Sequence, residues 1–337
     1  MTSFFTLATL ISFLTLSSSS FSSACNNIDL KALLVFKNSF PSTPFPTWTT
    51  SKDCCSWDNV ACDSSTGRVT SLSFFGNQVE NPSVGLNGSI PTSIGGLTAL
   101  ESITISSLTS LVGTIPPQLS KLKNLKTLII YSTKVSGPVP SFLSALPALE
   151  QITLANNMLE GTIPSSLGNL PNLNYIDLSG NQLHGAIPPS LFTKTKDKLP
   201  TFFVGGNKLT GEIPRSFGNV GFYNIDFHNN QLTGDASFLF GKSKPLAQIT
   251  LAGNKLSFDL SHVEYPVLNL GYVDISHNQI YGTISNQITE VRNLGLFDVS
   301  YNKLCGKIPS GGNFGQFGTQ SFEQNKCLCG TPLPACK

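Results

Sequence analysis

The segment Leu149–Pro164 has the sequence LEQITLANNMLEGTIP, and three further segments repeat its pattern. They are Leu173–Pro188, Leu270–Ser285 and Leu294–Pro309. The ninth residue of the pattern is an asparagine that recurs at intervals of 24, 26, 23, 24, 24 and 24 residues, at positions 157, 181, 207, 230, 254, 278 and 302. A unit this short cannot bury a core alone, so its copies must stack. The repeat therefore predicts an elongated solenoid with a long concave face, which is a surface suited to binding.

Each repeat contains two buried apolar residues that flank one outward residue, as Ile152 and Leu154 flank Thr153. This alternation predicts a short strand with one buried face. The recurring asparagine predicts a ladder of side-chain hydrogen bonds to neighbouring backbone groups. The Gly-x-Ile-Pro ending argues against a regular helix on the return side, because proline fixes φ and has no N–H. We count ten repeats within residues 67–309; Asn77, Leu108 and Thr133 stand at the asparagine position of the first three.

The first 24 residues contain no charged side chain and include an apolar stretch, Phe4–Leu16. A serine-rich run then ends in Ser22-Ser23-Ala24, a small-x-small pattern typical of a cleavage site. We interpret residues 1–24 as a secretory signal peptide, with an apolar strand as the alternative. No later segment approaches the ~20 apolar residues that a membrane-spanning helix needs, and we expect a free secreted protein.

Eight cysteines lie only near the two ends, at positions 25, 54, 55, 62, 305, 327, 329 and 336. An even number of cysteines in a secreted chain predicts disulfides. Zinc is the competing interpretation, but the four histidines match no ligand spacing. We therefore expect two disulfide-bonded caps, at residues 25–66 and 310–337, and no metal or cofactor. The net charge of +2 gives no support for a nucleic-acid partner.

Five segments resemble the polygalacturonase-inhibiting proteins of plants, which are extracellular leucine-rich repeat proteins. They are Asp53–Cys62 (DCCSWDNVAC), Gly234–Gly241 (GDASFLFG), Phe258–Ser261 (FDLS), Cys305–Gly312 (CGKIPSGG) and Cys327–Cys336 (CLCGTPLPAC). The resemblance implies an α/β leucine-rich-repeat solenoid with a parallel concave sheet and a second sheet beside it. It also implies the disulfides Cys25–Cys54, Cys55–Cys62, Cys305–Cys327 and Cys329–Cys336.

The resemblance further implies a cell-wall glycoprotein of plant defence, with fungal or insect endopolygalacturonases as partners and pectin or a receptor as further candidates. Relatives with the same caps include the carrot antifreeze protein and floral regulatory proteins. Ice binding and a ligand-sensing role beside a receptor therefore stay open as alternatives.

The outward strand residues carry the information that would separate these functions. From the second repeat to the tenth they are Thr104, Ile129, Thr153, Asp177, Phe203, Asp226, Thr250, Asp274 and Asp298. We expect the partner-binding face to consist of Thr153, Asp177, Phe203, Asp226, His228, Asp274 and Asp298. By resemblance, Asp226 and Asp274 match acids that engage a basic enzyme, whereas Thr153 and Ser179 stand where inhibitors carry acids. The alternative is that these aspartates only keep the sheet soluble.

Two further functions fit the same residues less well. Asp274 and Asp298 lie on adjacent predicted strands, as a pair of glycosidase carboxylates would. An open, shallow sheet excludes little water, whereas a catalytic acid of raised pKa needs burial, so we expect no catalytic residue and no enzyme activity. An ice-binding face needs a regular array of small polar groups, which Ile129 and Phe203 interrupt. The sequon Asn87-Gly88-Ser89 predicts N-glycosylation.

Overall fold

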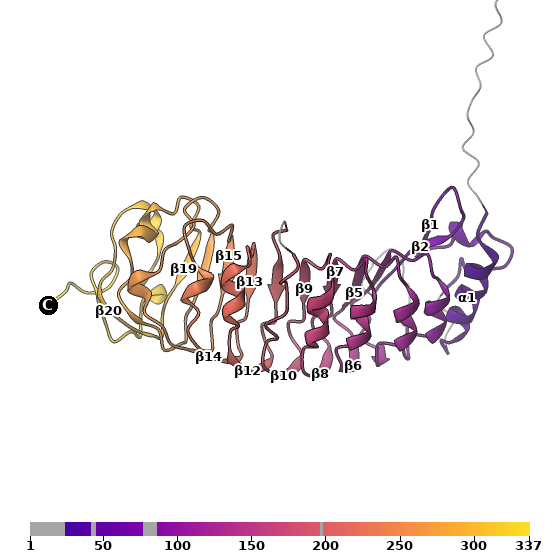
Figure 1. The fold of residues 1–337 in the computed structure, drawn as a ribbon, viewed down its shortest axis with the longest axis horizontal. Coiled ribbons are helices and arrows are strands. Elements are labelled where there is room, and N and C mark those ends of the chain that lie inside the picture. The colour runs from indigo at the N-terminus through magenta and orange to yellow at the C-terminus, as the bar shows by residue number, and fades with distance from the viewer. Residues whose placement is uncertain (1–23, 42–44, 77–85, 196–197) are drawn as a thin grey trace, which may run out of the picture.

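The computed structural model describes residues 24–41, 45–76, 86–195 and 198–337. The chain forms an elongated stack, with helix α1 (Asn27–Asn38) at one end and the C-terminal strands at the other (Figure 1). Asn77 and all but the last residue of the expected signal peptide lie outside the described residues. Within the described ranges, no helix is both long and apolar enough to cross a bilayer.

The inner face of the stack is an eleven-stranded sheet, termed here the concave sheet. Its first strand, β1, pairs antiparallel with β2, and the ten strands from β2 onward are parallel. These ten strands confirm the predicted ten repeats. The strands are β1 (Val60–Cys62), β2 (Val69–Phe75), β3 (Ser102–Ser106), β5 (Thr127–Tyr131), β7 (Gln151–Thr153), β9 (Tyr175–Asp177), β11 (Thr201–Phe203), β13 (Asn224–Asp226), β15 (Gln248–Thr250), β17 (Tyr272–Asp274) and β19 (Leu296–Asp298).

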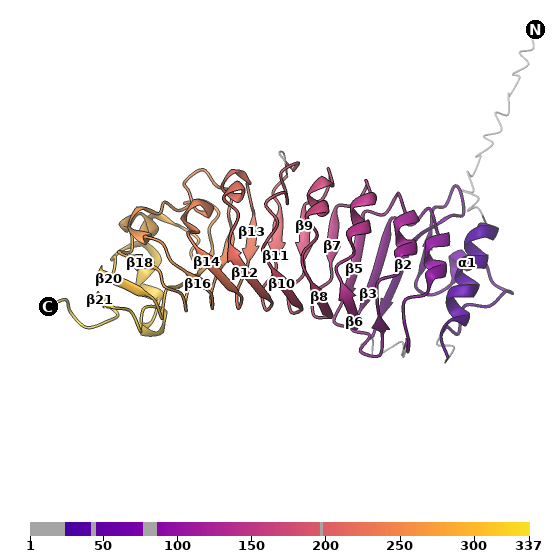
Figure 2. The ribbon, with the colours of Figure 1, turned by 60° about the horizontal axis from the view of Figure 1, so that its bottom comes forward.

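A second parallel sheet runs beside the concave sheet, as the resemblance implies (Figure 2). Its strands are β4 (Val112–Gly113), β6 (Lys134–Pro138), β8 (Met158–Gly161), β10 (Gln182–Gly185), β12 (Lys208–Glu212), β14 (Gln231–Gly234) and β16 (Lys255–Leu256). A separate three-stranded sheet continues the line with β18 (Tyr281–Gly282), β20 (Lys303–Lys307) and β21 (Cys327–Cys329).

The second sheet and the three-stranded sheet are separated by a gap, which lies where two consecutive repeats lack the Gly-x-Ile-Pro ending. GDASFLFG occupies Gly234–Gly241 and FDLS occupies Phe258–Ser261, and only an isolated bridge joins Asp259 to Tyr281 across the gap. A cleft of about 590 Å³ lies there, lined by residues of both motifs and by Tyr281.

The return side of the repeats consists of short 3₁₀ helices, most of which begin directly after a proline. Pro164, for example, precedes η5 (Ser165–Asn169). The others in the repeats are η2 (Thr92–Gly96), η3 (Pro117–Lys121), η4 (Ser141–Ala145), η6 (Arg215–Asn219), η7 (Ser237–Leu239), η8 (Leu260–His262) and η9 (Asn286–Glu290). Short 3₁₀ turns agree with the prediction that this side holds no regular α-helix.

The core is a continuous column of apolar residues between the sheets and the 3₁₀ helices. Its inner row is at most 1 % exposed and comprises Ile103, Leu128, Ile152, Ile176, Phe202, Ile225, Ile249, Val273 and Phe297. The asparagines form a ladder beside this column. Asn181 Nδ2 donates to the carbonyls of Leu154 and Leu178 at 2.9 and 3.0 Å, and its Oδ1 accepts from Leu159 N–H at 3.0 Å.

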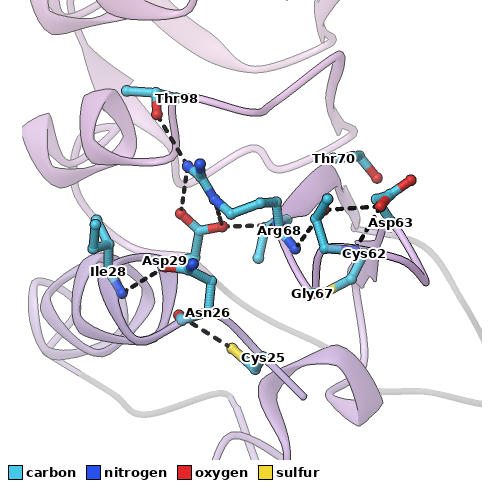
Figure 3. Close-up of polar contacts among 12 residues, drawn as sticks. Cys25, Asn26, Ile28, Asp29, Cys62, Asp63, Gly67, Arg68, Thr70 and Thr98 are labelled. Atoms are coloured by element: carbon cyan, nitrogen blue, oxygen red, sulfur yellow. Dashed lines mark hydrogen bonds and ion pairs between the residues drawn. The ribbon is translucent and has the colours of Figure 1, made fainter. Parts of the chain in front are cut away.

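The N-terminal cap closes the core with aromatic rings and with one partly buried ion pair. Asp29 is fully buried in α1, and it accepts from Arg68 Nε at 2.8 Å and from Val69 N–H at 2.8 Å (Figure 3). Arg68 also donates to Thr98 at 3.0 Å, so this pair joins the helix to the first two repeats. Asn26 caps α1 by accepting from Ile28 N–H. The disulfides here are Cys25–Cys54 and Cys55–Cys62.

The C-terminal cap covers the last repeat with η10 (Gly312–Gln316), η11 (Thr319–Ser321) and β21. Phe314 and Phe322 pack against Phe297 with ring centroids 5.2 and 6.3 Å apart. The disulfide Cys305–Cys327 joins the last repeat to this cap, and Cys329–Cys336 lies within the cap. All four bonds are therefore those that the resemblance implies. Asn325 extends the ladder into the cap by accepting from Leu304 N–H at 3.0 Å, which the repeat pattern did not predict.

Candidate functional site: the outward face of the concave sheet

The strand register places the outward residues in one straight row. Ile129 pairs with Thr153, Thr153 with Asp177, and Asp177 with Phe203. The row continues through four more strands with Asp226, Thr250, Asp274 and Asp298. The structure therefore brings together all the strand residues proposed for the binding face, and His228 follows two residues after Asp226.

The four aspartates share one local arrangement, in which each carboxylate accepts from the backbone N–H two residues later. The distances lie between 2.9 and 3.1 Å, for Asp177 with Ser179, Asp226 with His228, Asp274 with Ser276 and Asp298 with Ser300. Each aspartate thereby provides a hydrogen-bond acceptor for a backbone N–H just after the end of its own strand. Among the described residues none of the four forms an ion pair with lysine or arginine. Within the described ranges, the row is therefore an acidic surface without lysine or arginine partners of its own.

Burial raises the pKa of both Asp177 and Asp274 above the ordinary value, because desolvation disfavours their ionised form. The hydrogen bonds from Ser179 and Ser276 oppose this rise. Burial also raises the pKa of Tyr272, and the charges of Asp274, Asp226 and Asp298 add to the effect. Tyr272 therefore lies among three carboxylates, which identifies the C-terminal part of the face as its most negative region.

Aromatic rings accompany the acids in the middle of the face. Tyr175 and Phe203 lie on adjacent strands with ring centroids 6.0 Å apart in an edge-to-face arrangement. Phe203 is partly exposed, whereas Thr153, two strands away, is only 8 % exposed. Of the predicted contact residues, Thr153 thus offers the least surface to a partner.

His228 forms a close pair with Asp226. Its Nδ1 lies 2.6 Å from Asp226 Oδ1, and the two side chains are 37 % and 22 % exposed. Both residues were predicted to lie on the face, but their pairing was not. The sequence contained one indication of this pairing. Gly205 occupies the position of His228 in the preceding repeat, and its lack of a side chain leaves room for the imidazole.

A second pair of rings lies at the rim of the sheet and was also missed. His277 and Tyr301 follow β17 and β19 in the left-handed region, both with φ of 52°. Their rings stack at 4.1 Å with an interplanar angle of 10°. Both side chains are exposed, and their positions three residues after Asp274 and Asp298 lie outside the strand pattern, so that pattern did not predict them.

Comparison with known proteins assigns the chain to a family. The model of the leucine rich repeat N-terminal domain matches residues 26–63, and the model of the leucine rich repeat matches residues 123–183. A polygalacturonase inhibitor of Pyrus communis is 45 % identical over 322 residues, which cover 94 % of this chain and 93 % of that protein. Polygalacturonase inhibitor 2 of Arabidopsis thaliana is 43 % identical, with 98 % of both chains covered. The chain belongs to the polygalacturonase-inhibitor family.

Membership of this family confirms the resemblance identified in the sequence and the leucine-rich-repeat fold. Because these relatives are inhibitors and not enzymes, the prediction that the chain is not an enzyme is confirmed as well. The crystal structure of a plant ice-binding protein is also similar, with a TM-score of 0.86 and 40 % identity over 94 % of this chain and 99 % of that one. The fold alone therefore does not separate an inhibitor from an ice-binding protein.

Proposed function

We propose that this member of the family is a secreted protein that binds and inhibits endopolygalacturonase in plant defence. The observation that carries the proposal is the similarity to several polygalacturonase inhibitors at 43–45 % identity over nearly the full chain. Its contact surface is the outward face of the concave sheet, with Asp177, Asp226, Asp274 and Asp298 as anionic contacts and Phe203 as an apolar contact.

The chemistry of the enzyme supports this surface. A polygalacturonase binds a polyanionic substrate, so its cleft must carry cationic side chains. The aspartates have no lysine or arginine partner within the described chain and are free to pair with such cations. Carboxylates of this kind steer association and set specificity, while aromatic residues in a packed centre supply much of the affinity.

The cysteine chemistry supports an extracellular location. Structural disulfides such as these four are typical of oxidising environments and are rare in reducing ones, which fits secretion to the cell wall. The apolar, uncharged residues 1–24 are the signal that would direct it there.

The test is an assay of the reducing ends released from polygalacturonic acid by several fungal and insect endopolygalacturonases, with and without the purified protein. We expect concentration-dependent inhibition of at least one enzyme. Heat-denatured protein is the control for non-specific effects. If every enzyme in a broad panel retains full activity at micromolar protein, the proposed function is wrong.

Ice binding is the second candidate, and the structural similarity to an ice-binding protein is the observation that favours it. The outward row of the concave sheet opposes it, because Asp177, Phe203 and Asp226 interrupt any array of threonines. Thermal hysteresis and ice recrystallisation assays on the same preparation separate the two candidates. Ice activity together with a complete lack of inhibition would support this second candidate.

A further inference from the structure

The four aspartates of the concave face differ in the side chain that lies two residues after each of them. For Asp177, Asp274 and Asp298 that residue is serine, whose hydroxyl does not change its charge. Asp274 Oδ1, for example, accepts from Ser276 Oγ at 2.7 Å. For Asp226 it is His228, so one acid of this set has a titratable partner at 2.6 Å.

The imidazole of His228 is held in place from two sides. Asp226 Oδ1 accepts from the backbone N–H of His228 at 3.0 Å and lies 2.6 Å from Nδ1. On the preceding rung, a Cβ atom at Gly205 would lie only 2.2 Å from Nδ1 and 2.4 Å from Cε1 of this ring. The ring therefore occupies space that exists only because residue 205 has no side chain. Its Nε2 forms no hydrogen bond within the described chain and is left for a partner.

The neighbouring strands contain no cation that could compensate the pair. β11 and the turn after it contribute Phe203 and Gly205, and β15 with its turn contributes Thr250 and Ala252, none of which titrates. The nearest titratable groups of the face lie one strand further on each side. They are Tyr175 and Asp177 on β9 and Tyr272 and Asp274 on β17. Protonation of His228 thus places a positive charge in the middle of an acidic surface.

We propose that Asp226 and His228 form a pH-dependent contact for a cationic side chain of the bound enzyme, so that affinity falls when the imidazole becomes protonated. The proposal rests on the function proposed above. With a neutral imidazole, Nδ1–H donates to Asp226, the pair has a charge of −1, and the Nε2 lone pair can accept from a lysine or arginine. With a protonated imidazole, the pair is neutral and Nε2–H is directed at the same cation, which it repels.

Substitution, rather than the pH range, distinguishes the effect from titration of the carboxylates. Burial raises the pKa of Asp177 and Asp274, and a variant that lacks only the imidazole keeps both of these carboxylates. The other three aspartate–serine rungs provide the design of the test, because they show that serine is compatible with the same backbone position.

The experiment measures the Kd for an inhibited endopolygalacturonase by surface plasmon resonance at low salt, at pH 7.5 and at pH 5.5. We expect the wild-type protein to bind about 3- to 10-fold more weakly at pH 5.5, the size of effect of one charge near a partly exposed contact. The substitution His228→Ser should abolish most of this difference. His184→Ser, which removes an exposed histidine of β10 outside the concave sheet, is the matched control and should preserve it.

Gly205→Ala provides a second variant that changes no charge. Its methyl group should displace the imidazole from Asp226, so the pH difference should shrink while the melting temperature shows whether the fold is retained. Titration of the enzyme's own groups is common to all variants and cancels in the comparison. A pH difference that is the same in wild type and His228→Ser would overturn the proposal while leaving inhibition intact. A lack of binding at both pH values would instead contradict the proposed function itself, and this proposal with it.

Discussion

The two halves of the concave sheet share one backbone but differ in charge. In the N-terminal half, β2 to β7 present uncharged residues in the outward row: Ser73, Thr104, Ile129 and Thr153. In the C-terminal half, β9 to β19 present four carboxylates among six residues: Asp177, Phe203, Asp226, Thr250, Asp274 and Asp298. The repeat continues through both halves without a break in this sheet.

This difference shows that the aspartates are not needed to build a strand. Each aspartate closes its own strand end by accepting from the N–H two residues later, which is a structural contribution. Ile129 holds the equivalent position in β5 without any such group, and β5 is longer than β7 or β9. An explanation from folding alone therefore leaves the acidity of the C-terminal half unaccounted for, whereas the proposed binding of a cationic partner would account for it.

The largest expected effect comes from breaking the scaffold that both halves share. Asn181→Leu removes the hydrogen bonds of Nδ2 to the carbonyls of Leu154, Leu178 and Ser179. It also leaves Leu159 N–H without its acceptor in the core. We expect a loss of roughly 3–4 kcal/mol in the free energy of unfolding, measured by chemical denaturation. Lys194→Ala, in an exposed turn, is the control and should stay within about 0.5 kcal/mol of wild type. Equal losses in the two variants would refute the ladder as a source of stability.

The next effect tests the charge difference directly with the same substitution in each half. Asp226→Lys replaces an attraction with a repulsion and should raise the inhibition constant by at least ~10-fold. Thr104→Lys adds a lysine at the equivalent position in the N-terminal half and should change it less than ~3-fold. Added salt should reduce the difference, because it screens partly exposed charges. Similar inhibition constants for both variants, with normal melting, would show that the contact surface lies outside the C-terminal half.

A smaller effect concerns the cost of placing acids on the sheet. Burial raises the pKa of Asp274 in the folded protein, so the folded state binds its proton more tightly than the unfolded state does. The ionised carboxylate therefore reduces stability as the pH rises through the folded pKa. Asp274→Asn should raise the melting temperature by about 1–2 °C at pH 7, and the gain should shrink at pH 3. Calorimetry at the two pH values measures both.

Asp63 in the N-terminal cap provides the opposite case. Hydrogen bonds from the hydroxyls of Ser65 and Thr66 lower its pKa to about 2, below the ordinary value of 3.8. Its contribution to stability is present above that ordinary value and is lost as the pH falls through about 2. Asp63→Asn should therefore lower the melting temperature at pH 7, opposite in sign to Asp274→Asn. Shifts of the same sign would show that burial does not control the stability effect at Asp274.

The repeat made most of the fold predictable from the sequence. A strict spacing of Asn157, Asn181 and their counterparts constrains the backbone of every unit, and stacking then determines the sheet and the register. The outward row was predictable for the same reason, because buried residues such as Ile152 and Leu154 flank one outward residue in every repeat. Buried pairs that join distant segments have no such period. Asp29 with Arg68 is one example, because an acid in an amphipathic helix looks exposed until its partner 39 residues away is known.

The contacts within the face were harder to predict than its composition. The Asp226–His228 pair depends on a glycine one repeat earlier, and the stack of His277 on Tyr301 depends on two residues in the left-handed region. A strand pattern describes which side chains point outward but not how side chains of adjacent rungs pack. This is where one member of a repeat family can differ from another while it keeps the same core.

The smallest expected effect on inhibition comes from a predicted modification in the N-terminal half of the stack, outside the concave sheet. Asn87 is exposed and lies in the first repeat, with Ser89 of the sequon also exposed. We expect a glycan at this asparagine in protein secreted from plant cells, seen as a mass that Asn87→Gln and peptide N-glycosidase each remove. Because the proposed contacts begin at Asp177 and lie in later repeats, loss of the glycan should leave the inhibition constant within about 2-fold of wild type. A larger change, in protein with an unchanged melting curve, would extend the contact surface into the N-terminal half and weaken the division between the two halves.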